Sequence, residues 1–317
     1  MKKLLVLSIS ALLAAIFITG CASKPKASAP AAESNPESKK RVSSVTANGF
    51  TKNLIEIVSI PTAERDSAFA KASEEEPVDL MAFYMGQTEI SYPRWYEVYT
   101  WATANGYTFA NPGREGSDGK DGDKPTIANL PVTMISWRDA VVWCNAASEK
   151  DGLTPVYRYN GEVLREADSA KDGEGKAENA VIDTSATGYR LPTEAEWEFA
   201  ARGGDPDTER WNFLYCESRD DAGEVAWYSG NSGGKPHDMM QFRPNSFGMY
   251  DMLGNVWEWC YNPYSNNIMR RAMRGGSYKS GADGVTVVSR DMAPVSRAYE
   301  DVGFRVVKLA LSSRDAK

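Results

Sequence analysis

The sequence is poor in the residues that most metal centres and nucleophilic sites require. It contains one histidine, His237, and four cysteines, and no two cysteines are spaced as Cys-x-x-Cys. One histidine cannot supply a three-histidine iron or zinc site, and Ser-His-Asp catalysis would depend on His237 alone. His237 lies in the turn-like segment 233–238, where we expect a solvent-exposed loop residue.

An excess of positive charge is also missing. The 317 residues include 36 Lys and Arg against 43 Asp and Glu, which gives a formal net charge of −7. Nucleic-acid-binding proteins usually carry a basic patch, so this balance argues against nucleic acid as a partner. The composition, with 42% hydrophobic and 25% charged residues, is otherwise that of a globular protein.

Long apolar runs are absent except at the start of the chain. Lys2 and Lys3 precede a mostly apolar stretch over 4–18, which is short for a membrane-spanning helix of about 20 residues. The small residues that follow, up to Cys21, resemble the lipobox of bacterial lipoproteins. We therefore predict a signal peptide over 1–20 and lipidation of Cys21 by several acyl chains, palmitate among them, which anchor the protein in a membrane.

The segment after the predicted lipidation site is too polar to fold alone. Residues 21–47 are rich in Ala, Ser, Pro, Lys and Glu, and no large apolar residue precedes Val42. Such a composition is typical of a disordered tether. The sequence thus predicts one folded domain over 48–312, held off the membrane at the cell envelope, on the outer-membrane or cell-surface side.

Few cysteines remain for cross-links in an exported protein. Besides Cys21 they are Cys144, Cys216 and Cys260, an odd number that allows at most one internal disulfide. Cys144–Cys260 is a candidate pair, although spacing alone leaves the connectivity open.

Three helices and two early strands are predicted by local signals. Strands are expected over 54–60 and 81–85, and helices over 91–105, 136–150 and from 193 to about 202. The last two helices begin at capping-box spacings. After about residue 205 we expect short strands and irregular loops. Residues 111–124 and 161–179 read as surface loops, and Asp118, Asp121 and Asp123 lack the EF-hand spacing, which favours a solvated loop over a cation site.

Six segments occur together in an order that resembles the formylglycine-generating enzyme, or sulfatase-modifying factor, family. They are Phe83-Tyr-Met-Gly-Gln-Thr-Glu89, Pro131–Ala140, Gly188–Gly204, Pro244–Cys260, Arg274-Gly-Gly-Ser277 and Gly303-Phe-Arg305. The resemblance implies a single α+β domain, related to C-type lectins and loop-rich, with little regular secondary structure.

The resemblance also implies a structural calcium site. In the family, the positions that match Asp251 and Glu258 give side-chain oxygens, and those that match Gly254 and Val256 give backbone carbonyls. Two carboxylates and two carbonyls suit a hard divalent cation. By the same resemblance Trp257, Ser277, Tyr278, Ser280 and Arg290 lie in or near segments that line the ligand cleft.

Two cysteines of the oxidising members are absent from this chain. In those enzymes the segment after Arg274 carries two cysteines that bind copper, and the matching positions here are Ser280 and Val285. Cu(I) prefers sulfur ligands, so copper-dependent chemistry is not expected. We expect instead a non-catalytic module that binds a protein, peptide or glycan. The alternatives are a divergent formylglycine-generating oxidase acting on sulfatase cysteines, another enzyme using the same cleft, and surface carbohydrate binding, which the 9 Trp, 15 Tyr and 10 Phe suggest.

Overall fold

The computed structural model describes residues 54–57, 80, 82–167, 173–203 and 219–310. The predicted signal peptide, Cys21, the tether and Cys216 lie outside these residues. Within the described ranges, no helix combines the length and apolar character that crossing a membrane requires. The helices are α2 (Tyr92–Ala104), α3 (Trp137–Lys150), α4 (Glu194–Ala201) and the short 3-10 turns η3 (Arg219–Glu224) and η4 (Ala282–Gly284).

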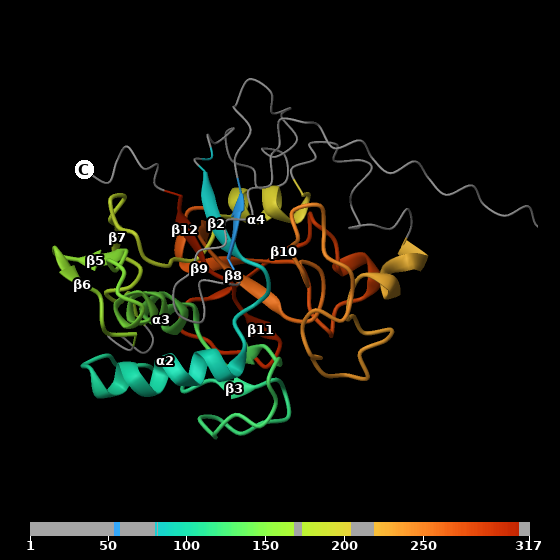
Figure 1. Ribbon diagram of the computed structural model, residues 1–317, viewed down its shortest axis with the longest axis horizontal. Helices are drawn as coiled ribbons and strands as arrows, with labels where there is room; N and C mark the ends of the chain where they lie inside the picture. Colours follow the sequence, from blue (N-terminus) through green and yellow to red (C-terminus); the bar gives the residue numbers. More distant parts are fainter. Residues whose placement is uncertain (1–53, 58–79, 81, 168–172, 204–218, 311–317) are drawn as a thin grey trace, which may run out of the picture. The chain divides into compact units, whose positions relative to one another are not determined.

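The strands are mostly short and form four small sheets (Figure 1). They are β1 (Leu54–Ile57), β2 (Phe83–Gly86), β3 (Arg114–Glu115), β4 (Val132–Thr133), β5 (Tyr157–Tyr159), β6 (Glu162–Val163), β7 (Val181–Ile182), β8 (Trp257–Tyr264), β9 (Asn267–Arg274), β10 (Arg290–Pro294), β11 (Val302–Gly303) and β12 (Val307–Leu309). Their orders are β1-β2-β12, β10-β9-β8-β11, β3-β4 and β6-β5-β7. The predicted loop-rich α+β class is confirmed.

The three predicted helices are present and begin at the residues that cap them. Ser91 accepts a hydrogen bond from the backbone N–H of Arg94 at the start of α2. α3 and α4 begin with reciprocal capping boxes, Ser136 with Asp139 and Thr193 with Glu196. Because each cap satisfies backbone N–H groups that the helix leaves free, these starts were readable from local sequence.

The β8–β9 hairpin is longer than the short strands expected after residue 205. Both strands have 8 residues, and Tyr264 pairs with Asn267 across a two-residue turn. Ser265 in that turn has a left-handed φ of 53°. Side chains alternate between the faces of this hairpin: Trp259 and Met273 join one apolar cluster, and Cys260 and Ala272 join another.

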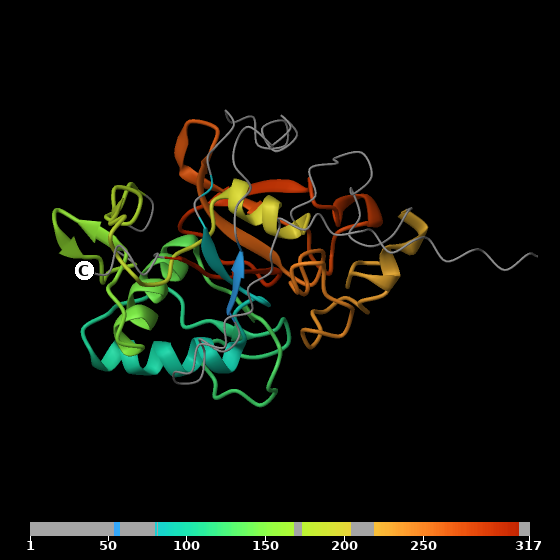
Figure 2. The ribbon, with the colours of Figure 1, turned by 45° about the horizontal axis from the view of Figure 1, so that its top comes forward.

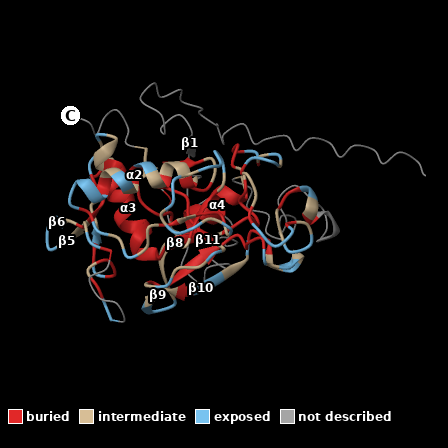
Figure 3. Cartoon of the chain, turned by 90° about the horizontal axis from the view of Figure 1, so that it is seen from below, coloured by how far each residue is buried: buried red, intermediate tan, exposed pale blue. Residues whose placement is uncertain are grey.

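The hairpin therefore separates two apolar cores. One contains the packed pair α2 and α3, and the other contains α4, which contacts β8 and β9. Figures 1 and 2 both show α4 on the opposite side of the hairpin from α2 and α3. Figure 3 shows α3 and α4 as largely buried, whereas the hairpin is buried at 258–260 and 271–274 and more exposed toward its turn.

The candidate disulfide between Cys144 and Cys260 is not formed. Both residues are free thiols and fully buried. They belong to different clusters, Cys144 to that of α3 and Cys260 to that of α4. Burial raises the pKa of both thiols, so they serve as small apolar core residues.

Candidate functional site

Three carboxylates and one guanidinium lie together in the interior, next to the β8 strand. We call Glu89, Asp251, Glu258 and Arg305 the acid cluster. Arg305 Nη2 is 2.6 Å from Glu258 Oε1, and Arg305 Nε is 2.6 Å from Glu258 Oε2. Glu258 Oε2 also accepts a hydrogen bond from Trp197 Nε1 at 2.7 Å. Glu258 Oε1 keeps a lone pair for a further ligand, because only Arg305 donates to it among the described residues.

The other two carboxylates of the acid cluster, Asp251 and Glu89, accept fewer hydrogen bonds than Glu258. Asp251 Oδ2 accepts a hydrogen bond from the backbone N–H of Met240 at 2.7 Å. Glu89 Oε1 accepts one from Asn255 Nδ2 at 3.1 Å, whereas its Oε2 is buried and has no partner within the described structure. A buried carboxylate oxygen without a donor is costly.

The acid cluster sets three carboxyl groups against one guanidinium. Burial raises the pKa of Glu89 well above its usual value, and the charges of Asp251 and Glu258 raise it further. Burial also raises the pKa of Asp251 to about 6. The chemistry of these oxygen donors is compatible with a hard divalent cation, which would offset surplus negative charge and give Glu89 Oε2 a partner. The described residues contain no group of three His, Cys, Asp or Glu side chains arranged to hold a metal by themselves, so backbone carbonyls would have to contribute.

The backbone of this segment forms a tight loop. Asp251, Gly254 and Asn255 all have left-handed φ angles, of 52°, 71° and 55°. A side chain at Gly254 would collide with the carbonyl oxygen of Trp227. This tight loop therefore needs glycine at 254 and turns consecutive peptide groups in different directions.

Two of the predicted cleft residues, Ser277 and Trp257, contact Asp301, and a third, Ser280, contacts Ser277. Ser277 Oγ donates to Asp301 Oδ2 at 2.9 Å, and the backbone N–H of Trp257 donates to the Asp301 carbonyl at 2.8 Å. Ser280 Oγ accepts from the Ser277 N–H at 3.0 Å. Ser277 and its neighbour Tyr278 are buried, so the surface here is formed mainly by Lys279 and Ser280.

The two positions of the missing cysteines do not form a copper site. Val285 is fully buried and packs in the α4 core, with no ligand atom. Ser280 Oγ is occupied by the backbone of Ser277. The described cysteines, Cys144 and Cys260, lie inside the two cores and do not replace the pair. These residues do not fit Cu(I), which needs accessible thiolates.

Arg290 is directed into a buried ion network. Its Nε and Nη2 atoms lie 2.6 and 2.7 Å from the two oxygens of Glu194 at the start of α4. Glu194 is also 3.4 Å from Arg274, which is paired with Glu198 at 2.5 Å. Arg290 thus closes a network between β10 and α4, and Figure 1 shows these elements at the same side of the fold.

His237 is not the solvent-exposed loop residue that we predicted. Its ring stacks on Trp227 with centroids 3.8 Å apart, and Nε2 donates to the Ser232 carbonyl at 2.7 Å. The His237 backbone N–H donates to Asn255 Oδ1 at 2.9 Å. Stacking and two hydrogen bonds hold the residue half-buried, which loop composition alone did not indicate. The three aspartates Asp118, Asp121 and Asp123 are exposed, as predicted.

Two residues of this region were missed by sequence reasoning. Asn255 joins three segments of the chain. Its side chain donates to Glu89 and accepts from the His237 backbone N–H, and its carbonyl accepts from the Tyr278 N–H at 2.8 Å. Glu89 ends the first of the six segments, so its position in a shared motif was the available signal. That signal did not say that residue 89 reaches a site formed 160 residues later.

A family model described as "Sulfatase-modifying factor enzyme 1-like domain" matches residues 42–310. The "Chaperone protein LppX" of Paenibacillus barcinonensis is 31% identical over 258 residues, which cover 74% of this chain and 82% of that protein. The "Inactive C-alpha-formylglycine-generating enzyme 2" of Mus musculus is 34% identical over 137 residues, 39% of this chain and 44% of that protein. The chain therefore spans less than half of the length of the mouse relative.

Solved structures show the same fold. "Crystal Structure of CarF" matches with a TM-score of 0.62 and 31% identity, covering 74% of this chain and 88% of that one. "Treponema denticola variable protein 1" matches with a TM-score of 0.62 and 26% identity, covering 81% and 94%. With a family model matched over most of its length, the chain belongs to the sulfatase-modifying factor enzyme 1-like family.

Proposed function

We propose that this member of the family is a non-catalytic module that binds a protein partner at the cell envelope. The observation that supports this most is the pair Ser280 and Val285: a capped hydroxyl and a buried valine stand where the oxidising members have copper-binding cysteines. The relative that matches over most of its length is named a chaperone, and another relative is named inactive. The first name favours binding of a polypeptide, and the second is consistent with a member that does not oxidise.

The acid cluster would bind a structural calcium ion in this function. Asp251 and Glu258 would give carboxylate oxygens, Gly254 and Val256 carbonyl oxygens, and Glu89 the oxygen that has no partner. The ion would supply positive charge and rigidity. Its role is to stabilise the loop around Asn255, on which both Tyr278 and His237 depend.

The absence of oxidase activity is tested directly. The protein should leave the cysteine of a sulfatase-type peptide unchanged during incubation with copper and oxygen, as read by mass spectrometry. A formylglycine-generating enzyme, such as that of Thermomonospora curvata, serves as the positive control. Conversion of the cysteine to an aldehyde by this protein would overturn the proposal. A glycan array with specific hits would favour carbohydrate binding instead.

The proposed location depends on Cys21. In bacterial cells the Cys21→Ser variant should move from the membrane fraction to the soluble exported fraction, because it has no site for acyl chains. Incorporation of a labelled fatty acid, measured in parallel, should be lost in the same variant. A Cys216→Ser variant is the matched control and should stay in the membrane fraction. Retention of Cys21→Ser in the membrane would contradict lipid anchoring at this residue.

A further inference from the structure

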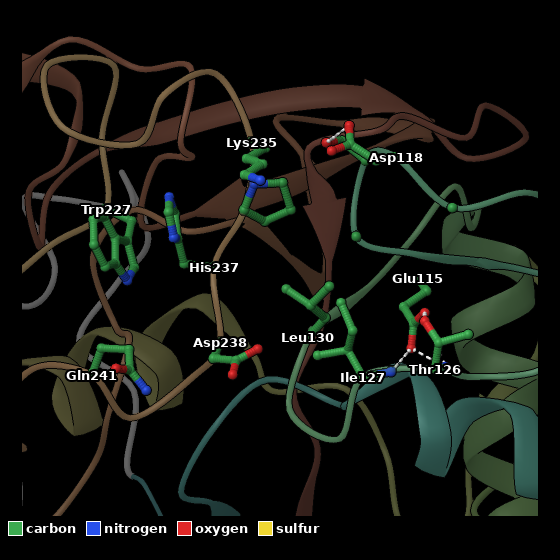
Figure 4. A pocket seen from close by; sticks show the side chains of 14 residues that line it. Glu115, Asp118, Thr126, Ile127, Leu130, Trp227, Lys235, His237, Asp238 and Gln241 are labelled. Carbon is green, nitrogen blue, oxygen red and sulfur yellow. Dashed lines mark hydrogen bonds between the residues drawn. The ribbon is translucent and has the colours of Figure 1, made fainter.

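A cavity of about 630 Å³ lies beside the acid cluster, outside the predicted cleft residues. One side is formed by the loop that joins β3 to β4, and the other by residues between 227 and 241. Figure 4 shows the side chains of both segments facing one another across the opening. None of its lining residues belonged to the ligand or metal positions that the sequence suggested.

One wall of the cavity combines an aromatic pair with a carboxylate. Trp227 and His237 stack, and Figure 4 shows the Asp238 carboxylate beside them, directed across the cavity toward Leu130 and Ile127. Asp238 is half-buried and accepts no hydrogen bond from the described residues. A partly desolvated carboxylate next to aromatic rings is suited to a cationic group, which gains a charge-assisted hydrogen bond and ring contact.

The charge of the lining supports a cationic ligand. Glu115, Asp118 and Asp238 are acidic, and Lys235 is the one Lys or Arg among the lining residues. Glu115 is committed to its own loop, since its oxygens accept from the backbone N–H groups of Thr126 and Ile127 at 2.7 to 3.1 Å. Asp118 accepts a hydrogen bond from Ser117 Oγ at 3.0 Å, which leaves Asp238 as the lining carboxylate for a ligand, and the excess of acidic side chains favours a cationic one.

The opposite wall is apolar and partly open to solvent. Ile127 keeps 43% of its surface exposed, and Leu130 lies next to it in Figure 4. An exposed isoleucine beside a half-buried carboxylate suits a ligand with an apolar group next to a cationic one. A polypeptide provides this combination, either within one long basic side chain or in two side chains that are neighbours in its sequence.

The aromatic wall is fixed in place before any ligand binds. Asn255 Oδ1 accepts from the His237 N–H, and Asp251 Oδ2 accepts from the Met240 N–H, so Asn255 and the acid cluster's Asp251 anchor the segment on the two sides of Asp238. Ser232 Oγ donates to the Tyr278 carbonyl at 2.9 Å, which ties the same loop to the segment after Arg274. A preformed wall lowers the entropy cost of binding.

We propose that this cavity binds an extended segment of the protein partner, through a basic side chain that reaches Asp238 between the Trp227–His237 stack and the apolar wall of Ile127 and Leu130. The proposal rests on the proposed function, because it assumes a polypeptide partner.

Matched synthetic peptides test the recognition of the basic group. The probe is a fluorescein-labelled heptapeptide with Leu-Lys-Leu at its centre, and its partner has acetyl-lysine instead of lysine. Fluorescence anisotropy with the full protein should show saturable binding of the lysine peptide. The acetyl-lysine peptide should bind at least about tenfold weaker, because its neutral amide loses the charge-assisted hydrogen bond.

Two variants locate the binding to the cavity. Asp238→Asn keeps the size of the side chain and removes its charge, so the lysine peptide should bind about tenfold weaker, near the acetyl-lysine value. Asp291→Asn changes an exposed aspartate on β10 and should bind like the unchanged protein. Both variants should melt at nearly the same temperature as the unchanged protein, which separates recognition from folding.

The outcomes distinguish this proposal from the proposed function. Equal affinities for the two peptides, an unchanged affinity of Asp238→Asn, or no saturable binding of either peptide would overturn the cavity assignment. Peptide binding that is lost on substitution of Lys279 but not of Asp238 would keep a polypeptide-binding function and move its site to the surface after Arg274. Aldehyde formation in the oxidase assay would overturn the proposed function itself.

Discussion

Replacing Arg274 with methionine should lower the free energy of unfolding by about 3 to 5 kcal/mol, because it removes the fully buried cation of an ion network. Arg274 Nη2 lies 2.5 Å from Glu198 Oε2 and 2.9 Å from the Val287 carbonyl, and the side chain has no exposed surface. Without Arg274, a carboxylate and a carbonyl would remain in the interior with fewer donors. Urea unfolding followed by circular dichroism measures the loss.

Arg290→Met is the matched control for Arg274. Arg290 pairs with the same network through Glu194, but its side chain keeps 12% of its surface exposed. Glu194 also retains Arg274 as a partner in this variant. We therefore expect a loss below about 2 kcal/mol, with water replacing part of the interaction. An equal loss in the two variants would contradict the leading role of Arg274 in joining β9 to α4.

Local signals predicted the parts of the fold that depend on neighbours in sequence. Ser136 and Asp139, or Thr193 and Glu196, are three residues apart, so each helix start was visible without tertiary information. At the end of α4, Gly203 has a left-handed φ of 62°, a conformation for which glycine is the usual residue. In each case backbone N–H groups or steric limits at a helix end determine the residue types.

Contacts between distant segments were not predictable in this way. The charge balance of the acid cluster depends on Glu89, Asp251, Glu258 and Arg305, which come from different parts of the chain. Cys144 and Cys260 offered a plausible pair by count alone, yet the hairpin places them in separate cores. The spacing of two cysteines in the sequence does not show whether they lie on the same side of a sheet, because that depends on how the sheet packs.

The acid cluster and the cavity are parts of one connected structure. Asn255 binds Glu89 on one side and the His237 backbone on the other, and its N–H donates to the Trp227 carbonyl at 2.8 Å. Asp251 in turn holds Met240. A cation bound by the cluster therefore acts on the segment that carries Asp238. Coupling of this kind is reciprocal, so a ligand in the cavity would favour the cation-bound arrangement.

Removing calcium should lower the melting temperature of the protein by several degrees. At about 100 times its dissociation constant, a ligand of the folded state stabilises by about 2.7 kcal/mol, and each kcal/mol corresponds to roughly 2 to 4 °C in a domain of this size. Calorimetry of calcium-stripped protein, with and without added calcium, measures the difference. Equal melting in both conditions would contradict calcium binding by the acid cluster.

Asp251→Asn should separate two effects of the Asp251 charge, namely its cost in the calcium-free protein and its contribution to calcium binding. Asparagine tolerates the left-handed φ of 52° at this position and can still accept from the Met240 N–H, so the loop should be preserved. In chelator the variant should melt at or above the temperature of the unchanged protein, because one unbalanced buried carboxylate is gone. Its gain on adding calcium should be smaller, because a charged ligand is lost. Asp291→Asn removes the same charge at the surface and should show the full gain. A variant that is less stable in chelator yet keeps the whole calcium response would show that Asp251 acts only through its hydrogen bond to Met240.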